Sequence, residues 1–221
     1  VKVFNPTYKT ETTDAYIKIT PRPITITVDD AEKYFDTADP EFTGNIMKGT
    51  LVAESDLGKI SYSRTNEDEA VGTYTGVLSA NYTKNGNYEV TVIPGNFVIK
   101  TSSVDGAALA PAGGSKVYNG TPLFANAQVT GAEGYTIYYQ VVGSGWTKAP
   151  PFVTNVSEGK VTVHTKAVKT GYEDLVGKDV TIQILPRPIT ITVNDAWKNH
   201  GTKDPTFTGG ITSGNLVMND D

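Results

Sequence analysis

The sequence predicts an all-β chain of tandem small β-sandwich modules with almost no helix. Three observations support this prediction. Thr, Gly, Val and Tyr are abundant, and β-branched and aromatic side chains suit a pleated surface. No window of about 11 residues or more shows a sustained apolar period of 3.6 residues. Short apolar-alternating runs are separated by Gly and Pro clusters, which is typical of sandwiches.

The strands can be read in order from their period of two. In residues 24–28 Ile24, Ile26 and Val28 alternate with threonines, as a half-buried strand does. The same alternation occurs in residues 88–92, 180–184 and 189–193. Phe97 and Ile99 follow a Pro-Gly break.

Two short motifs predict local geometry. Asn85-Gly86 lies between two strand candidates and could supply the φ > 0 residues of a type I′ hairpin turn. Pro21-Arg22-Pro23 and Pro186-Arg187-Pro188 precede the strands at 24 and 189. Because proline fixes φ and favours an extended predecessor, we expect short, stiff linkers there.

An internal repeat sets the domain organisation. Residues 21–56 align without a gap to residues 186–221, at an offset of 165, with 22 of 36 positions identical. The segments preceding both copies are also similar. We therefore expect two alternating domain types, one at 21–101 and the other at 102–185. Residues 1–20 would be the end of a preceding copy of the second type.

Composition excludes several kinds of partner and site. The formal net charge is −5 with a pI of about 5.1, which argues against nucleic acid or anionic lipid as a partner. The chain has no cysteine, which excludes disulfide-built domains and thiolate zinc sites. No apolar run is long enough for a membrane span, and no signal peptide opens the chain.

The first domain type resembles the MBG domain of bacterial surface adhesins. The resemblance rests on PRPITITVDDAEKYFDTADPEFTG at 21–44, GTYTGVLSANY at 72–82 and NYEVTVIPGNFVIK at 87–100. Lys33, Tyr34, Asp39 and Pro40 match the family's pattern, whereas Phe35 replaces the expected glycine. A β-grasp-like arrangement is an alternative for this module. Residues 186–221 would be the first half of another MBG-type domain.

The second domain type resembles an Ig-like repeat of Gram-positive surface proteins. Its markers are VYNGTPL at 117–123, YYQVVGSGWTKAPP at 138–151 and VTVHTKAVKTGYEDLVGKDVTIQI at 161–184. Residues 1–20 would then be the C-terminal strand region of an upstream Ig-like repeat.

Together these resemblances imply a stalk or adhesin region of an extracellular protein at the cell wall of a Gram-positive bacterium. It would act as a rigid spacer or adhesive module and not as an enzyme. A glycan- or mucin-binding module and an accessory region of a cell-surface hydrolase are the alternatives. The expected partner is a host glycan or protein, or none, with no nucleic acid and no membrane insertion.

Aromatic residues of the second domain are the candidate ligand contacts. Trp146 could stack on a sugar ring if it is exposed, and Tyr135, Tyr138 and Tyr139 lie nearby in sequence. Alternation requires that at least one tyrosine of this run points outward. The competing interpretation is that Trp146 packs across the sandwich.

Asp29, Asp30, Asp36 and Asp39 form an acidic cluster in the sequence. Surface turns and caps account for it best, because aspartate suits both. A calcium site would use the same oxygen ligands, and a glycosidase carboxylate pair is a third alternative. The second copy replaces two of the four carboxylates. We therefore expect no cofactor, with Ca²⁺ as the alternative.

Three further features of the sequence are only weak indicators of a chemical site. His164 falls on the outer face of its strand with Thr162 and Lys166, and His200 lies in a loop, so no catalytic triad is expected. A Lys33–Asn96 isopeptide bond is conceivable.

The terminal segments are too short to bury a core alone. We expect residues 186–221 to be ordered only by packing on the second domain or by strand pairing with a neighbouring chain. The same expectation applies more weakly to residues 1–20.

Overall fold

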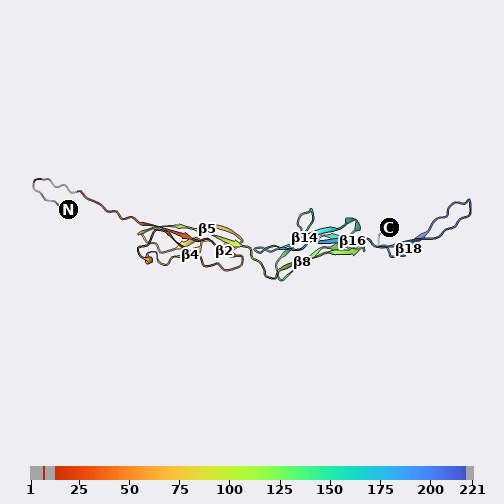
Figure 1. Ribbon diagram of the computed structural model, residues 1–221, viewed down its shortest axis with the longest axis horizontal. Helices are drawn as coiled ribbons and strands as arrows, with labels where there is room; N and C mark the ends of the chain where they lie inside the picture. Colours follow the sequence, from red (N-terminus) through yellow and green to blue (C-terminus); the bar gives the residue numbers. More distant parts are fainter. Residues whose placement is uncertain (1–6, 8–12, 218–221) are drawn as a thin grey trace. The chain divides into compact units, whose positions relative to one another are not determined.

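The computed structural model describes Thr7 and residues 13–217. The chain divides into two compact units at Lys100, here called unit 1 (residues 1–100) and unit 2 (residues 101–221) (Figure 1). Both are built of strands, and 3% of the chain is helical, so the all-β prediction is confirmed. Among the described residues, no helix has the length and apolar character needed to cross a membrane.

Unit 1 is a sandwich of two sheets with strand orders β3-β1-β6 and β2-β7-β5-β4. The two sheets have no α-helix against them in the described residues, so the β-grasp-like alternative does not describe this unit. The strands are β1 (Arg22–Val28), β2 (Ala31–Tyr34), β3 (Gly44–Lys48), β4 (Ser61–Arg64), β5 (Gly72–Asn81), β6 (Tyr88–Ile93) and β7 (Gly95–Lys100).

The first and last strands of unit 1 run together as a parallel ribbon. β1 pairs with β6 from Arg22↔Tyr88 to Thr27↔Ile93, and β2 pairs with β7 from Ala31↔Phe97 to Tyr34↔Lys100. The partners are 66 residues apart throughout, although the ribbon passes from one sheet to the other. The first two strands of unit 1 are therefore paired with its last two strands along nearly their whole length.

The crossing of the ribbon between the sheets is tight. The Asn96 N–H donates to Asp30 Oδ1 at 2.6 Å. A Cβ on Gly95 would lie 2.5 Å from the Asp29 carbonyl oxygen. Only glycine fits this close approach, which explains the Pro-Gly break between β6 and β7.

The core of unit 1 lies between the two sheets. β1 contributes Ile24, Ile26 and Val28, which confirms the face predicted from alternation, and Phe97 and Ile99 come from β7. Further buried members are Leu57, Leu78, Ala80 and Tyr88. Alternate residues of each strand meet in this layer, as expected for a sandwich.

A 3₁₀ turn, η1 (Glu54–Leu57), closes one end of this core. It buries Leu57 completely and places the Asp56 carboxylate beside the Tyr88 hydroxyl, which donates to it at 2.5 Å. The Ala53 N–H also donates to this carboxylate, at 3.0 Å. These hydrogen bonds lower the pKa of Asp56, and the bond to Asp56 raises the pKa of Tyr88.

The Asn85-Gly86 prediction was wrong. β5 pairs with β4 and β7, whereas β6 pairs with β1, so the segment connects two sheets and not two hairpin strands. Gly86 is not among the residues with positive φ. The turn is instead held by Tyr88 N–H donating to the Asn85 carbonyl and Asn87 N–H donating to Asn85 Oδ1, both at 3.0 Å.

The first Pro-Arg-Pro segment is less of a linker than expected. Arg22 and Pro23 already belong to β1 and pair with β6. Pro23 is tolerated because β1 pairs with β3 only from Thr25 onward, so the missing N–H costs no ladder hydrogen bond.

Unit 2 contains a group of β-sheets followed by a hairpin. The main sheet has the order β12-β14-β16-β9, with β15 beside β14, and two pairs, β11-β8 and β10-β13, accompany it. The strands are β8 (Ala108–Ala112), β9 (Gly114–Val117), β10 (Leu123–Phe124), β11 (Asn126–Thr130), β12 (Thr136–Val141), β13 (Phe152–Val153), β14 (Val161–Val168), β15 (Leu175–Val176) and β16 (Val180–Leu185). A second 3₁₀ turn, η2, spans Val156–Glu158.

The core of unit 2 is separate from that of unit 1. Its buried residues are Ala125, Tyr139, Val153, Val163, Ile182 and Ile184. The early strand β9 again runs parallel to the late strand β16, from Gly114↔Ile182 to Val117↔Leu185. In both units an early strand thus pairs in parallel with a later one.

The hairpin of unit 2 comprises β17 (Thr190–Val193) and β18 (Gly209–Ser213), which pair antiparallel at the blue end of the chain in Figure 1. Every residue of both strands is exposed. Arg187 Nη1 donates to the Tyr118 carbonyl at 3.4 Å, a contact with the segment that follows β9. Strand pairing of this segment with another chain stays a prediction.

Candidate functional site

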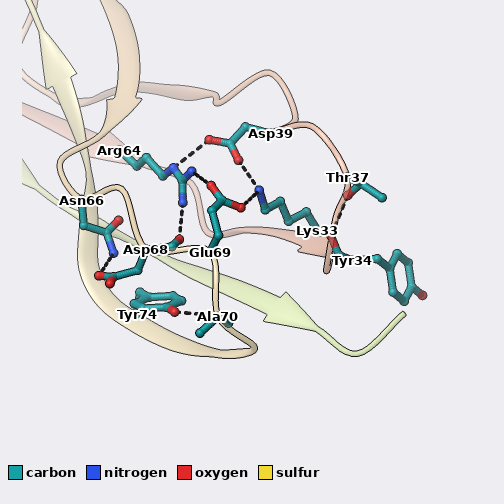
Figure 2. A network of polar contacts seen from close by, with 10 residues as sticks. All are labelled: Lys33, Tyr34, Thr37, Asp39, Arg64, Asn66, Asp68, Glu69, Ala70 and Tyr74. Atoms are coloured by element: carbon teal, nitrogen blue, oxygen red, sulfur yellow. Dashed lines mark hydrogen bonds and ion pairs between the residues drawn. The ribbon is translucent and has the colours of Figure 1, made fainter. Parts of the chain in front are cut away.

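A network of four charged side chains joins β2 and β4, the two outer strands of the sheet β2-β7-β5-β4, through two loops (Figure 2). Lys33 comes from β2, Asp39 from the loop that follows it, Arg64 from the end of β4, and Glu69 from the loop before β5. Lys33 Nζ lies 2.9 Å from Asp39 Oδ1, and Arg64 Nε lies 2.8 Å from Asp39 Oδ2. Both cations also contact Glu69.

The electrostatics of the network favour fully charged partners. Glu69, and then Asp39, raise the pKa of Lys33 although its burial opposes this. Lys33 and Arg64 lower the pKa of Glu69. The raised pKa of Lys33 and the lowered pKa of Glu69 both favour the charged forms, so this ion pair keeps its charges at neutral pH.

The network's physical role is to tie two loops to the sandwich. Lys33 is almost fully buried, and burial of an unpaired ammonium would be costly. Arg64 also donates to the Asp68 carbonyl at 2.7 Å, and its guanidinium carbon lies 5.3 Å from the centroid of the buried Phe97 ring. The network therefore couples the loops at 35–43 and 65–71 to the core.

The acidic cluster of the sequence is divided among separate partners. Asp29 accepts from the Thr43 hydroxyl at 2.7 Å, Asp30 holds Asn96, and Asp39 joins the ion-pair network. In the described part of the chain no three or more His, Asp or Glu side chains gather as a metal site would require. Calcium binding stays a prediction, without a preformed cage.

The structure does not bring Lys33 and Asn96 together, so the isopeptide hypothesis is wrong in that form. The Asn96 amide oxygen accepts from Gly76 N–H at 3.0 Å, and its amide nitrogen faces Asp30 at 3.3 Å. Lys33 faces Asp39 and Glu69 instead. Asn96 therefore stabilises the crossing of the ribbon between the sheets and is not a partner of Lys33.

The candidate aromatic residues of unit 2 separate into exposed and buried members. Tyr139 is 4% exposed, and its hydroxyl accepts from the Ala127 N–H at 3.1 Å, so it is a core residue. Trp146 is 42% exposed and therefore does not pack fully inside the sandwich. Tyr135 and Tyr138 are half-buried.

Lysine side chains accompany the aromatic rings on the outer face of β12 and β14. Lys166 is the cross-strand partner of Tyr138, and its Nζ lies 5.1 Å from the centroid of the Trp146 ring. Lys148 Nζ lies 5.7 Å from the Tyr138 ring. We call Tyr138, Trp146, Lys148 and Lys166 the aromatic–lysine face. Alternation in residues 160–168 placed Lys166 outward, but only the register of β12 with β14 places it beside the rings.

Two other features of unit 2 involve none of the four residues of the aromatic–lysine face. A hollow of about 700 Å³ is lined by residues 107–111, 174–176 and 178–180, and by none of the four candidate aromatic residues. His164 is on the outer face of β14 as predicted, and its Nδ1 lies 2.6 Å from Asp179 Oδ1. The sequence analysis missed Asp179 because the contact depends on the pairing of β14 with β16.

Comparison with known proteins gives one family. Residues 24–98 match the MBG domain of the YGX type, a span that begins in β1 and ends in β7. The comparison with curated proteins gives no match. Within this segment Asp36 is the non-glycine residue with left-handed φ, at 62°, one position beyond the Phe35 that replaces the expected glycine. MBG domains occur in surface and extracellular proteins. Residues 24–98 of this chain therefore form an MBG module.

Proposed function

We propose that this chain is a repetitive stalk or adhesive region of an extracellular surface protein of a Gram-positive bacterium, and that it is not an enzyme. The MBG match and the two separately packed units support this function. The role we propose is mechanical, namely to hold a more distal part of the protein away from the cell wall.

The observation that carries the proposal is the parallel pairing of early and late strands in both units. Tension on a stalk enters unit 1 near Arg22 and leaves near Lys100. These residues lie at opposite ends of the parallel ribbon, so the pull acts along the strands in opposite directions. All backbone hydrogen bonds of the ribbon then resist together, whereas a pull from one end would break them one after another.

Single-molecule pulling on unit 1 tests this mechanical role. The chain has no cysteine, so introduced pairs define the direction of force without interference. Thr20→Cys with Thr101→Cys pulls the ribbon lengthwise. Thr20→Cys with Gly86→Cys pulls β1 and β6 apart from the end where Arg22 meets Tyr88.

The expected result is a much higher unfolding force for the lengthwise pair. All three positions are exposed, and a Cβ on Gly86 meets no atom within 4 Å, so neither pair should perturb the fold. Thermal unfolding without force is the control and should be the same for both. Equal unfolding forces in the two directions would contradict the mechanical function.

A glycan-binding function is the second candidate, favoured by the exposure of Trp146. An exposed indole beside a lysine offers a flat stacking surface with a hydrogen-bond donor, which suits a sugar ring. The test is a glycan array with the whole chain and with Trp146→Ala. Trp197→Ala is the matched control, because Trp197 is 84% exposed but lies outside the aromatic–lysine face. Absence of binding, or binding that both variants retain, would remove this candidate.

A further inference from the structure

The loop after β12 is hydrogen-bonded to the outer edge of that strand, which is the first strand of the main sheet. The Tyr139 N–H donates to the Thr147 carbonyl at 2.7 Å, and the Thr147 N–H donates to the Tyr139 carbonyl at 2.8 Å. The Ser144 N–H donates to the Val141 carbonyl at 2.9 Å, and Gln140 Nε2 donates to the Ser144 carbonyl at 2.7 Å. The loop is therefore held in place by the protein itself, which lowers the entropic cost of binding a ligand.

Alternation around this pairing turns Trp146 and Lys148 outward. Thr147 pairs with Tyr139, which is buried in the core, so the residues on either side of Thr147 face the solvent. Trp146 and Lys148 are both exposed, in agreement with this register. Tyr138 precedes Tyr139 on β12 and lies on the same outer face.

The Tyr138 ring lies between two lysines on this face. Lys166 is its cross-strand partner on β14, and the register continued from Thr147 places Lys148 beside it on the opposite side. Because neighbouring strands lie about 4.8 Å apart, the strands that carry the two lysines are separated by roughly 10 Å. The Trp146 ring lies between the level of the sheet and the solvent, with its centroid 5.1 Å from Lys166 Nζ. Rings and ammonium groups therefore form one surface.

The aromatic–lysine face is cationic, although the chain has a formal net charge of −5. Among the described residues Lys148 forms no ion pair, and Lys166 has a distant partner in Asp174, at 3.6 Å. His164, further along β14, is paired with Asp179. Charges more than about 8 Å away are largely screened at physiological ionic strength. An anion at this face therefore responds to the two lysines more than to the net charge of the chain.

We propose that the aromatic–lysine face binds glycans that carry a carboxylate, and that it prefers them over the corresponding neutral glycans. This inference rests on the glycan-binding candidate function and specifies its ligand. The apolar side of a sugar ring stacks on Trp146, and the carboxylate of the glycan accepts hydrogen bonds from Lys148 or Lys166. A neutral glycan uses the indole alone, whereas an acidic peptide has the charge but no sugar ring to stack.

Asp174 gives this preference a direct test, because its carboxylate competes with the ligand for Lys166. Asp174 Oδ2 lies 3.6 Å from Lys166 Nζ, and both side chains are partly exposed. Asp174→Asn removes the competing charge and keeps both lysines. The affinity for an acidic glycan should then rise about two- to fivefold, and the affinity for a neutral glycan should not change. An unchanged affinity for the acidic glycan would contradict the role of Lys166.

The main experiment measures binding of the whole, immobilised chain to matched pairs of soluble probes by biolayer interferometry. A polymer that carries sialyllactose is compared with the same polymer carrying lactose, and polygalacturonate is compared with its methyl ester. The two pairs distinguish sialic acid from uronic acid as the source of the carboxylate, and polyglutamate supplies carboxylates without sugar rings. At least one acidic glycan should bind about five- to tenfold more tightly than its neutral partner. This difference should shrink as the ionic strength rises.

Variants of the chain locate the binding. Lys148→Gln combined with Lys166→Gln should reduce the affinity for the acidic glycan to that for its neutral partner. Trp146→Ala should abolish binding of both. Lys169→Gln is the matched control and should bind as the parent does, because Lys169 Nζ also lies against a ring, 4.3 Å from the Tyr172 centroid, but outside the aromatic–lysine face. Thermal unfolding verifies that each variant is folded.

The outcomes separate this inference from the function on which it rests. Equal binding of acidic and neutral partners, lost in Trp146→Ala, would keep the glycan-binding function and overturn the preference for carboxylates. Binding of polyglutamate as tight as that of the acidic glycan would also overturn it, as would acidic-glycan binding that the double lysine variant retains. Absence of binding to every probe would remove the glycan-binding function and this inference together.

Discussion

Replacing Phe97 tests the claim that the MBG module has its own core. Phe97 is 0% exposed, pairs with Ala31 on one side and Tyr74 on the other, and meets Phe42 edge-on at a centroid distance of 5.6 Å. It also lies under the Arg64 guanidinium. Phe97→Ala keeps the backbone pairing but removes the ring contacts with Phe42 and Arg64, and it leaves a cavity between the sheets.

The expected cost follows from this burial. Phe→Ala in a core destabilises by about 3–5 kcal/mol, and the ring contacts place Phe97 in the upper part of that range. A module of roughly 80 residues has a free energy of unfolding of about 4–12 kcal/mol. Phe97→Ala should therefore leave unit 1 close to its unfolding threshold. Ile99→Val, at about 1 kcal/mol, is the graded variant that keeps it folded.

The two tryptophans make the assay specific for each unit. Trp146 and Trp197 both belong to unit 2, so tryptophan fluorescence during urea unfolding follows unit 2, whereas far-UV circular dichroism follows both. Phe97→Ala should shift one circular dichroism transition and leave the fluorescence midpoint unchanged. Ile182→Ala in unit 2 should shift the fluorescence midpoint together with the circular dichroism transition of unit 2, and leave the transition of unit 1 unchanged. Equal movement of both transitions by either variant would refute the separation of the cores.

Two further predictions concern the loops of unit 1. The pKa of Glu69 is lowered in the folded state, so its contribution to stability is present above its ordinary pKa of 4.5 and is lost as the pH falls through the lower folded value. Glu69→Gln should therefore destabilise unit 1 at pH 7 and make no difference at strongly acidic pH. Urea unfolding midpoints of the parent and the variant across this pH range measure the difference. A difference that persists in acid would contradict the ion-pair explanation. Asp36 has φ of 62°, whereas the second copy has Gly201 with φ of 83° at the equivalent position. Asp36→Val should lower the free energy of unfolding by about 1–2 kcal/mol, and Asp36→Gly should change it little or not at all. Thermal unfolding measures both variants. Equal effects would show that strain in the left-handed conformation is not the cause.

Alternation and the repeat predicted much of the fold. The strands at 24–28, 88–92 and 180–184 form where the period of two placed them, because one face of each is buried. The Asn85-Gly86 turn was misjudged because a turn motif carries no information on which sheet the next strand joins. The parallel ribbon could not be predicted, since its partners are 66 residues apart and pairing at that distance leaves no local pattern.

The candidate sites were predicted less completely. Lys33 and Asp39 stood out as motif residues, but Arg64 and Glu69 join them only through the position of β4 and the loop before β5. Alternation required at least one tyrosine in residues 135–139 to point outward but did not identify that tyrosine. In the structure, the pairing of β12 with β14 turns Tyr139 inward. Contacts between strands, and not residue types, decide which of the polar and aromatic candidates meet.

The parallel ribbon connects the fold of unit 1 to the proposed stalk function. Unit 1 closes by pairing its last two strands with its first two, so a force on its two ends is opposed by the whole ribbon at once. A force that separates β1 from β6 at Arg22 and Tyr88 meets one pair of hydrogen bonds at a time. The ratio of the two unfolding forces therefore measures how much the ribbon contributes, independently of the stability that the core gives to unit 1.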